Sequence, residues 1–260
     1  MLPIIWTQCE GTAEIGQLVA QPWRVVESQH QVSTRKLVDS EAEHELLEQL
    51  IERAKPPLPA DSEGLHYLLA TPFRYPPLRH GSRFATRFER GVWYGAAARR
   101  TAFAEAAYYR LLFLEGTAAD LAPLRLDLAL FRARVKTSHG VDLTDAPFRE
   151  FTATISSATN YDASQQLGRE MRAAGVEACR YRSARDIRGG ANFGVFAAAA
   201  FAAARPSHPQ AWYAVITPEM VEISKRDVFR HQLHRFPRSD FLVGGRLPSP
   251  GAATAAGPGS

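Results

Sequence analysis

Four side chains in this sequence could together form a catalytic or binding site. Arg83 follows a Gly-Ser turn, Tyr94 ends a short apolar run 11 residues later, and Glu105 comes a further 11 residues on. Ser183 comes much later in the chain, directly after a strand predicted at 176–182. Each residue also has a plainer interpretation. Tyr94 could belong to the core and Ser183 to a turn, while Arg83 and Glu105 could form a surface ion pair worth at most about 1 kcal/mol.

Glu105 carries the strongest chemical signal of the four. Its neighbours in the segments 102–104 and 106–107 are all apolar. A carboxylate in such surroundings loses hydration, and a partner or a substrate must offset that loss, so such groups are often functional. Ser183 lies in no Gly-x-Ser-x-Gly motif and has no recognisable histidine base, which argues against a serine-hydrolase triad. We therefore expect Ser183 to be a hydrogen-bonding residue of a substrate pocket.

The elements that must position these residues are a strand at 91–95, a helix at 101–115 and a strand at 176–182. A strand that leads into a helix brings its last residues and the first helical turn to one edge of a sheet. The N-terminus of the helix favours an anion there. The apolar run at 191–201, which contains Asn192, is expected to be a central strand or a buried helix. Three prolines predict an extended path through 71–78.

The remaining pattern predicts a fold of the α+β class, with a mixed or split sheet and flanking helices, because strands and helices do not alternate strictly. Leucines at every second position predict the strand at 124–130. Other strands are expected at 23–26 and in a hairpin formed by 212–216 and 221–224, and another helix at 162–174.

A further amphipathic helix is predicted at residues 40–54. Ser40 and Glu43 form an S-x-x-E capping pattern, and Leu46, Leu47, Leu50 and Ile51 follow at helical spacing before Pro56. Its apolar face is expected to pack on the core by default, and contact with a partner protein is the alternative.

Composition places the chain among ordinary globular proteins, with 45% apolar and 22% charged residues. No stretch approaches the roughly 20 apolar residues of a membrane span, and no basic region precedes the apolar N-terminal residues as in a secretory signal. The cysteines, Cys9 and Cys179, are far apart and have no metal-ligand spacing, so we expect free thiols in a reducing cytoplasm and no metal.

The basic composition leaves open a different class of function, namely nucleic-acid binding. The net charge is +4, and 27 of the 31 basic residues are arginines. However, the sequence lacks a recognition-helix pattern and paired aromatic stacking motifs, so direct nucleic-acid binding is not expected. The feature that supports this alternative is a run of basic residues with Glu89 as its one opposing acid, namely Arg79, Arg83, Arg87, Arg90, Arg99 and Arg100.

Five short motifs, taken together and in order, resemble the RES family, which is named for an arginine, a glutamate and a serine. The first three are GSRF at 81–84, GVWYGA at 91–96 and TAFAE at 101–105. The other two are YRSAR at 181–185 and GANF at 190–193. The resemblance covers roughly residues 65–225. Each motif is weak by itself, whereas the ordered set is fairly specific.

This resemblance implies a fold like that of ADP-ribosyltransferase toxins and an activity that degrades NAD⁺ by hydrolysis or phosphorolysis. Transfer of ADP-ribose to a protein is the alternative. NAD⁺ would be a substrate, and no cofactor is implied. Many members are toxins paired with an Xre-type helix-turn-helix antitoxin. The expected division of the chain is an N-terminal extension at 1–64, a RES domain at 65–244 and a disordered tail at 245–260.

The resemblance also implies a role for each site residue. Glu105 would stabilise an oxocarbenium-like transition state, Arg83 would bind the pyrophosphate, and Tyr94 would pack against nicotinamide or ribose. Ser183 would hydrogen-bond to nicotinamide or to the adjacent ribose, with Asn192 as a further substrate-binding candidate. The arginine motif reads GSRF, where the family often has a second glycine before the arginine and Trp-Asn after it. The sequence therefore leaves open whether Arg83 or Arg74 binds the phosphates.

Overall fold

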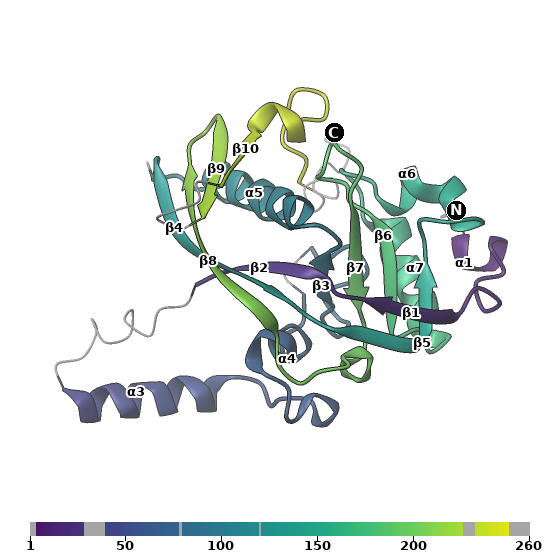
Figure 1. The fold of residues 1–260 in the computed structure, drawn as a ribbon, viewed down its shortest axis with the longest axis horizontal. Helices are drawn as coiled ribbons and strands as arrows, with labels where there is room; N and C mark the ends of the chain where they lie inside the picture. Colours follow the sequence, from purple (N-terminus) through teal and green to yellow (C-terminus); the bar gives the residue numbers. More distant parts are fainter. Residues whose placement is uncertain (1–3, 29–39, 78–79, 120, 226–231, 250–260) are drawn as a thin grey trace, which may run out of the picture.

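A computed structural model describes residues 4–28, 40–77, 80–119, 121–225 and 232–249. Ten strands in this part of the chain form one mixed sheet in the order β1-β5-β6-β7-β3-β2-β4-β8-β9-β10 (Figure 1). The pairs are antiparallel except for β5 and β6, which run parallel. In chain order the strands are β1 Gly16–Ala20, β2 Trp23–Glu27, β3 Trp93–Ala96, β4 Leu124–Arg132, β5 Val135–Asp142, β6 Ala178–Arg182, β7 Ala191–Val195, β8 Ser207–Ile216, β9 Met220–Lys225 and β10 Leu233–Pro237.

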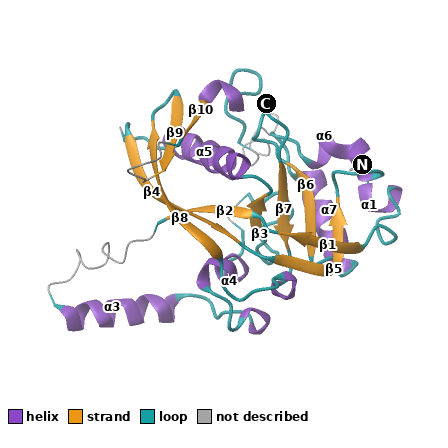
Figure 2. Ribbon diagram, viewed as in Figure 1, coloured by secondary structure: helices purple, strands orange, loops and turns teal. Residues whose placement is uncertain are grey.

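Helices flank this sheet, which confirms the predicted α+β class (Figure 2). Helix α5 packs against the half of the sheet formed by β2, β4, β8, β9 and β10, while α1, α6 and α7 lie by β5, β6 and β7. Helix α4 adjoins β3. Their bounds are α1 Ile5–Gln8, α3 Glu41–Ala54, α4 Tyr67–Arg74, α5 Arg99–Glu115, α6 Thr152–Ile155 and α7 Asp162–Ala173.

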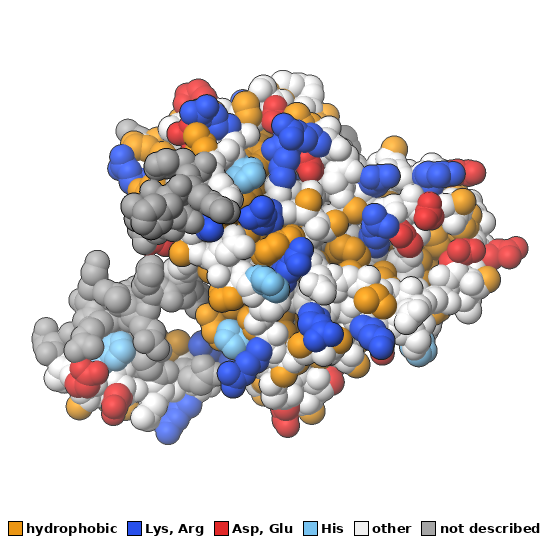
Figure 3. Space-filling model, in the orientation of Figure 1, with side chains coloured by type: hydrophobic (Ala, Val, Ile, Leu, Met, Phe, Trp, Pro, Cys, Tyr) orange, Lys and Arg blue, Asp and Glu red, His pale blue; other side chains and the backbone are white. Residues whose placement is uncertain are grey.

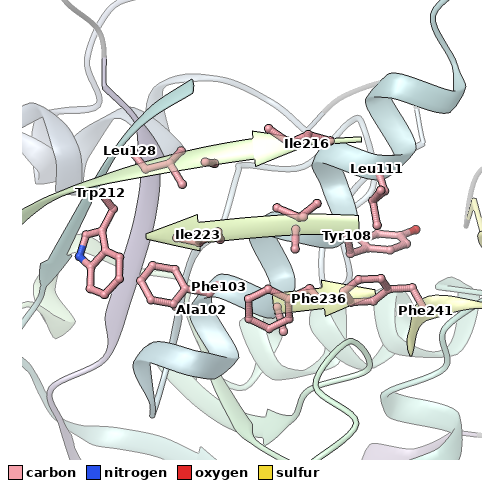
Figure 4. Close-up of a cluster of buried hydrophobic side chains, with 14 of the residues drawn as sticks. Ala102, Phe103, Tyr108, Leu111, Leu128, Trp212, Ile216, Ile223, Phe236 and Phe241 are labelled. Atoms are coloured by element: carbon pink, nitrogen blue, oxygen red, sulfur yellow. The ribbon is translucent and has the colours of Figure 1, made fainter. Parts of the chain in front are cut away.

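Aromatic side chains anchor α5 to the sheet (Figure 4). The Phe103 ring lies 4.7 Å from the Trp212 ring, centroid to centroid, and both side chains are fully buried. Tyr108 packs near Phe241 at 6.1 Å. Burial of a large apolar side chain contributes roughly 1.5–3 kcal/mol, so this cluster fixes the position of α5. Because Glu105 lies between Phe103 and Tyr108 on the same helix, the packing also fixes where that carboxylate can point.

Helix α4 corrects the first half of the extended path predicted for residues 71–78, because Pro72 lies inside the helix and the chain becomes extended only at Tyr75. A proline lacks the N–H that would normally bond to the carbonyl four residues earlier. Here that carbonyl, of Leu68, accepts a hydrogen bond from the indole Nε1 of Trp93 at 3.2 Å. Trp93 is fully buried. A side chain from the sheet therefore replaces the missing backbone donor and lets the helix continue to Arg74.

The helix predicted at 40–54 is confirmed as α3, and Ser40 Oγ accepts the Glu43 N–H at 3.2 Å as the capping pattern requires. Its expected packing on the core is wrong. Leu46 and Leu50 are 55% and 51% exposed, and the helix projects from the body of the molecule (Figure 1). The spacing of apolar residues predicts an amphipathic helix, but it does not indicate what packs against the apolar face.

The two segments that flank the expected RES domain contribute more to the fold than the sequence suggested. Strands β1 and β2 come from the predicted N-terminal extension, and β2 lies in the middle of the sheet. At the other end, the start of the predicted disordered tail is packed. Leu247 is buried in the core around α5, and the Tyr108 hydroxyl donates to the Pro248 carbonyl. Residues 250–260 of that tail lie outside the described residues.

Two further predictions concern cysteines and membranes. Cys9 and Cys179 are free and buried, as expected. Burial raises the pKa of the Cys179 thiol to about 12, so it is an unreactive core residue. In the described part of the chain, no helix combines the length and the apolar character that a membrane span requires.

Candidate active site

A cavity of about 600 Å³ opens between β2, β3, the end of α4 and the first turns of α5. This volume lies within the roughly 300–1,000 Å³ of small-molecule sites. Of the predicted site residues, Arg83, Tyr94, Glu105 and Asn192 line it. Thus residues separated by more than 100 positions in the chain meet at one place, at the junction of the two halves of the sheet.

Glu105 is held by two hydrogen bonds to the same carboxylate oxygen. Its Oε1 accepts the Ser183 hydroxyl at 2.7 Å and the Asn192 amide Nδ2 at 2.6 Å. Both donors come from the other half of the sheet, at the end of β6 and in β7. Hydrogen bonds to an ionised carboxylate are short and strong. Because both bonds go to Oε1, the carboxylate is fixed in orientation, while Oε2 accepts no hydrogen bond from the described residues.

Ser183 has a different place from the one the sequence predicted. Its hydroxyl donates to Glu105 and accepts the N–H groups of Arg185 at 3.1 Å and Asp186 at 3.0 Å. A serine hydroxyl offers one donor and two acceptor positions, so these three bonds use all of them. Ser183 is also not among the residues that line the cavity. In this arrangement the hydroxyl positions Glu105 and has no capacity left for a substrate.

The loop at 183–190 that carries Ser183 is anchored on the start of α5. The Thr101 hydroxyl donates to Asp186 Oδ2 at 2.8 Å, and Arg100 Nε lies 3.7 Å from Asp186 Oδ1. Asp186 and Thr101 are buried. The loop closes where the Ser183 N–H donates to the Gly190 carbonyl at 2.8 Å. These contacts join the helix that bears Glu105 to the segment that orients its carboxylate.

Arg83 is a buried residue of the cavity wall. Its Nη1 donates to the carbonyls of Ile155 at 2.9 Å and Ser157 at 3.0 Å, and its guanidinium lies 4.7 Å from the Tyr161 ring centroid. Burial by itself lowers the pKa of Arg83. Tyr161, Tyr181 and Glu105 together raise that pKa by more than burial lowers it, so the net pKa lies above the ordinary value and the side chain stays charged. Its predicted contact with phosphate would have to use the nitrogens other than Nη1, and it stays a prediction.

Tyr94 holds the segment that carries Arg83. Its hydroxyl is hydrogen-bonded to Ser82 Oγ at 3.0 Å and accepts the Phe84 N–H at 3.1 Å. Burial raises the pKa of Tyr94 to about 12, so the hydroxyl is protonated at any physiological pH. The ring borders the cavity. Tyr94 can therefore both contact a ligand and fix the residues on either side of Arg83.

The two remaining predicted residues differ in position. Asn192 is 3% exposed, and among the described residues its Oδ1 has no hydrogen-bond partner. A buried acceptor without a partner costs about 1–3 kcal/mol, and a donor on a ligand would remove that cost. Arg74 does not line the cavity, and its Nε donates to the Pro56 carbonyl at 2.5 Å. Of the two arginines that the sequence left open, Arg83 is the one at the cavity.

Tyr161, Tyr181 and Arg24 are among the cavity-wall residues that sequence reasoning did not assign to the site. Tyr161 and Tyr181 flank Arg83. Tyr181 begins the YRSAR motif, whereas no local pattern marks Tyr161. Arg24 also lines the cavity, from β2. Its signal was present, since a single arginine interrupts the otherwise apolar strand pattern of residues 23–26.

The run of arginines that supported nucleic-acid binding does not form one basic surface. Arg83 is buried, Arg90 pairs with Asp61 at 2.7 Å, and Arg100 pairs with Asp186. Arg79 lies outside the described residues. On the face shown in Figure 3, basic side chains are dispersed among acidic and uncharged ones. A continuous basic stripe is what non-specific nucleic-acid binding requires, so the structure does not favour this alternative.

Comparisons with known proteins identify the family of this chain. The family model of the RES domain matches residues 58–216, and the chain belongs to the RES domain family. A search of curated proteins finds no match. Among solved structures, a chain of the M. tuberculosis MbcT–MbcA toxin–antitoxin complex aligns with a TM-score of 0.48 at 14% identity, covering 84% of this chain and 95% of that chain. This similarity is distant, and the family assignment rests on the domain match.

Proposed function

We propose that this protein is a toxin that cleaves the nicotinamide–ribose bond of NAD⁺. The observation that carries the proposal is the orientation of Glu105, whose Oε2 is left for a ligand at the edge of a cavity of about 600 Å³. The RES family membership supports the same reading, because the resemblance of the motifs implies an enzyme that degrades NAD⁺.

The chemistry needs little beyond a well-placed carboxylate. When the bond between ribose C1′ and the nicotinamide nitrogen breaks, the electron pair goes to nicotinamide, which leaves as a neutral molecule. Positive charge then develops on C1′ and the ring oxygen, as in glycoside hydrolysis. A fixed carboxylate stabilises this charge without reorganisation. The oxygen of water or phosphate then bonds to C1′, and a water acceptor loses a proton to solvent.

Four residues of the cavity have a part in this scheme. Glu105 stabilises the charge on the ribose through Oε2. Asn192 accepts a hydrogen bond from a ribose hydroxyl or from the nicotinamide carboxamide through its unpartnered Oδ1. Tyr94 packs against the nicotinamide end, and Arg83 binds the pyrophosphate through its nitrogens other than Nη1. Metal chemistry has no part in this scheme.

The proposal includes a protein partner. An enzyme that consumes NAD⁺ in the cytoplasm of its own cell needs an inhibitor, and the family resemblance implies an Xre-type helix-turn-helix antitoxin. A segment of the antitoxin that occupied the cavity would block access to Glu105. Uncontrolled expression of the chain alone should therefore arrest growth, and coexpression of the antitoxin should restore it.

Product identification tests the activity directly. Purified protein is incubated with NAD⁺ with and without inorganic phosphate, and nicotinamide and ribose-containing products are separated by mass. Free ADP-ribose indicates hydrolysis, a phosphorylated ADP-ribose indicates phosphorolysis, and a mass increase on added cellular proteins indicates ADP-ribosyl transfer. Intact NAD⁺ after prolonged incubation without phosphate, with phosphate, and with added cellular proteins would refute the proposed activity.

Removal of the Ser183 hydroxyl tests its positioning role. A hydrogen bond to a charged group is worth about 1.5–3 kcal/mol, and each 1.4 kcal/mol is tenfold in rate. We expect Ser183→Ala to lower kcat about tenfold with little change in KM, because the hydroxyl orients Glu105 and does not touch substrate.

Ser183→Thr is the matched variant, since it keeps the hydroxyl, and it should retain most of the activity. A rise in KM with unchanged kcat in Ser183→Ala would instead indicate direct contact with the substrate. Steady-state measurement of nicotinamide release distinguishes these outcomes.

A further inference from the structure

The cavity has a second end, on the face of the sheet opposite to Glu105. Neighbouring residues of a strand point to opposite faces. In β7, Asn192 donates to Glu105 of α5. The next residue, Phe193, belongs to a buried cluster that also contains Phe73 of α4. Helices α5 and α4 therefore lie on opposite faces of the sheet (Figure 1), and because residues of both helices line the cavity, it passes from one face to the other.

The sheet leaves room for this passage where β2 and β3 diverge. The two strands pair at one position, Trp23 with Ala96, and residues of both line the cavity. Ala96 lies opposite Asn192 and so marks the end at Glu105. Gly91, which also lines the cavity, comes five residues earlier, and at about 3.3 Å per residue it lies up to about 17 Å away. Cleavage of one glycosidic bond takes place at the first end, which leaves the second for the rest of a long substrate.

A close backbone approach at Gly91 builds the second end. A Cβ at this position would lie 2.0 Å from the Pro72 carbonyl oxygen and 2.6 Å from the Tyr75 carbonyl oxygen. Glycine therefore allows the last turn of α4 to lie against the residues that lead into β3. This contact holds the segment that follows α4 at the cavity.

The side chains of the second end are uncharged and mostly apolar. They include Thr71, Pro72, Tyr75, Pro76, Pro77 and Val92. The Tyr75 side chain is the aromatic one among them, and with 37% exposure its ring is accessible to a ligand. Aromatic side chains stack on the flat face of a nucleobase, whereas a phosphate needs cationic or N–H donors. The composition of this end thus fits a heteroaromatic base.

We propose that the second end binds the adenine of the dinucleotide, with Tyr75 as the stacking residue. The inference rests on the proposed function. The dinucleotide then extends through the sheet, with the nicotinamide riboside at Glu105 and the adenine beside the end of α4. Tyr75 contributes to the affinity for the whole dinucleotide and takes no part in bond cleavage.

A purely structural role for Tyr75 makes a different prediction. If the side chain served only to hold the end of α4 in place, its loss would disturb the cavity as a whole. Ligands with and without adenine would then bind more weakly to the same extent. A stacking residue, by contrast, discriminates between the two kinds of ligand.

The test follows the consumption of NAD⁺ by the full-length protein, with AMP and nicotinamide mononucleotide as competitors. The two mononucleotides each carry one ribose and one phosphate, and they differ in the base. We expect Tyr75→Ala to raise the KM for NAD⁺ and the Ki for AMP about tenfold, as for loss of one stacked base. The Ki for nicotinamide mononucleotide and kcat should not change, because stacking remote from the reacting bond stabilises substrate and transition state equally. Tyr75→Phe keeps the ring and should behave as the parent does.

Tyr67→Ala is the matched control. Tyr67 begins α4, is 59% exposed and is not among the residues that line the cavity, so its loss should leave KM and both Ki values unchanged. An unchanged KM for NAD⁺ and Ki for AMP in Tyr75→Ala would overturn the inference, and so would an equal rise in the Ki for nicotinamide mononucleotide. In both cases the parent still consumes NAD⁺, and the proposed function stands. If the parent consumed no NAD⁺, the proposed function would fall together with the inference.

Discussion

Glu105→Gln is expected to lower the rate of nicotinamide release about 10²–10³-fold, because loss of one preorganised electrostatic group costs that much in comparable sites. The substitution is nearly isosteric. The side-chain carbonyl of glutamine can still accept the Ser183 hydroxyl and the Asn192 amide, which now meet at Oε1. The orientation is therefore preserved, and what is removed is the negative charge next to the ribose. The binding of NAD⁺ should change much less than kcat.

The matched control for this variant lies on the same helix. Glu115, at the end of α5, pairs with Arg238 at 2.8 Å and is remote from the cavity. Glu115→Gln removes the same charge from the same element and should keep the parent activity. If Glu105→Gln released nicotinamide at the parent rate, the assigned mechanism would be wrong. In cells, expression of the parent should arrest growth, and expression of Glu105→Gln should not.

Gly190→Ala is expected to reduce both stability and activity strongly. A Cβ at Gly190 would lie 2.2 Å from Thr101 Oγ1 and 2.6 Å from Asp186 Oδ2, where those two buried side chains are hydrogen-bonded to each other. Relief of such overpacking costs about 1–3 kcal/mol. It would also shift the loop that carries Ser183 against Glu105. Misplacement of a catalytic group by about 1 Å can cost 10²-fold in rate, so we expect a loss of activity approaching that size.

The neighbouring glycine provides the control for this prediction. Gly189 has a positive φ of 75°, but a Cβ there would meet nothing within 4 Å. Gly189→Ala should therefore cost about 1–2 kcal/mol of conformational strain and leave the activity near that of the parent. Thermal unfolding and nicotinamide release, measured on both variants, separate strain from displacement. Parent activity in Gly190→Ala would contradict the role given to the loop.

Local sequence signals predicted the elements around Glu105 well. The segment rich in alanine and leucine that ends before Gly116 predicted a helix, and this helix is α5. The alternating leucines predicted the strand β4. The strand before Ser183 is β6, and the run that contains Asn192 begins with β7. The hairpin around Thr217 is formed by β8 and β9. These predictions succeeded because periodicity and turn residues are properties of neighbouring positions.

The features that sequence could not supply depend on contacts between distant segments. The polar stretch of β5 became a strand because it pairs with β1 and β6. Pro72 remained in a helix because Trp93 reaches the Leu68 carbonyl. Likewise, no local pattern shows that the Ser183 hydroxyl is fully used by the protein. Position in a motif identifies a residue, whereas its hydrogen-bond partners decide its role.

The central position of β2 has a consequence for how the protein folds during its synthesis. Its partners β3 and β4 are translated much later, so β2 leaves the ribosome well before the strands with which it pairs. Pairing over such separations is slow. A chain cut back to residues 58–216 would divide the sheet and leave β3 and β4 with open edges, which invite pairing with other chains. A nascent or truncated copy therefore lacks one wall of the cavity until β2 has paired with β3 and β4.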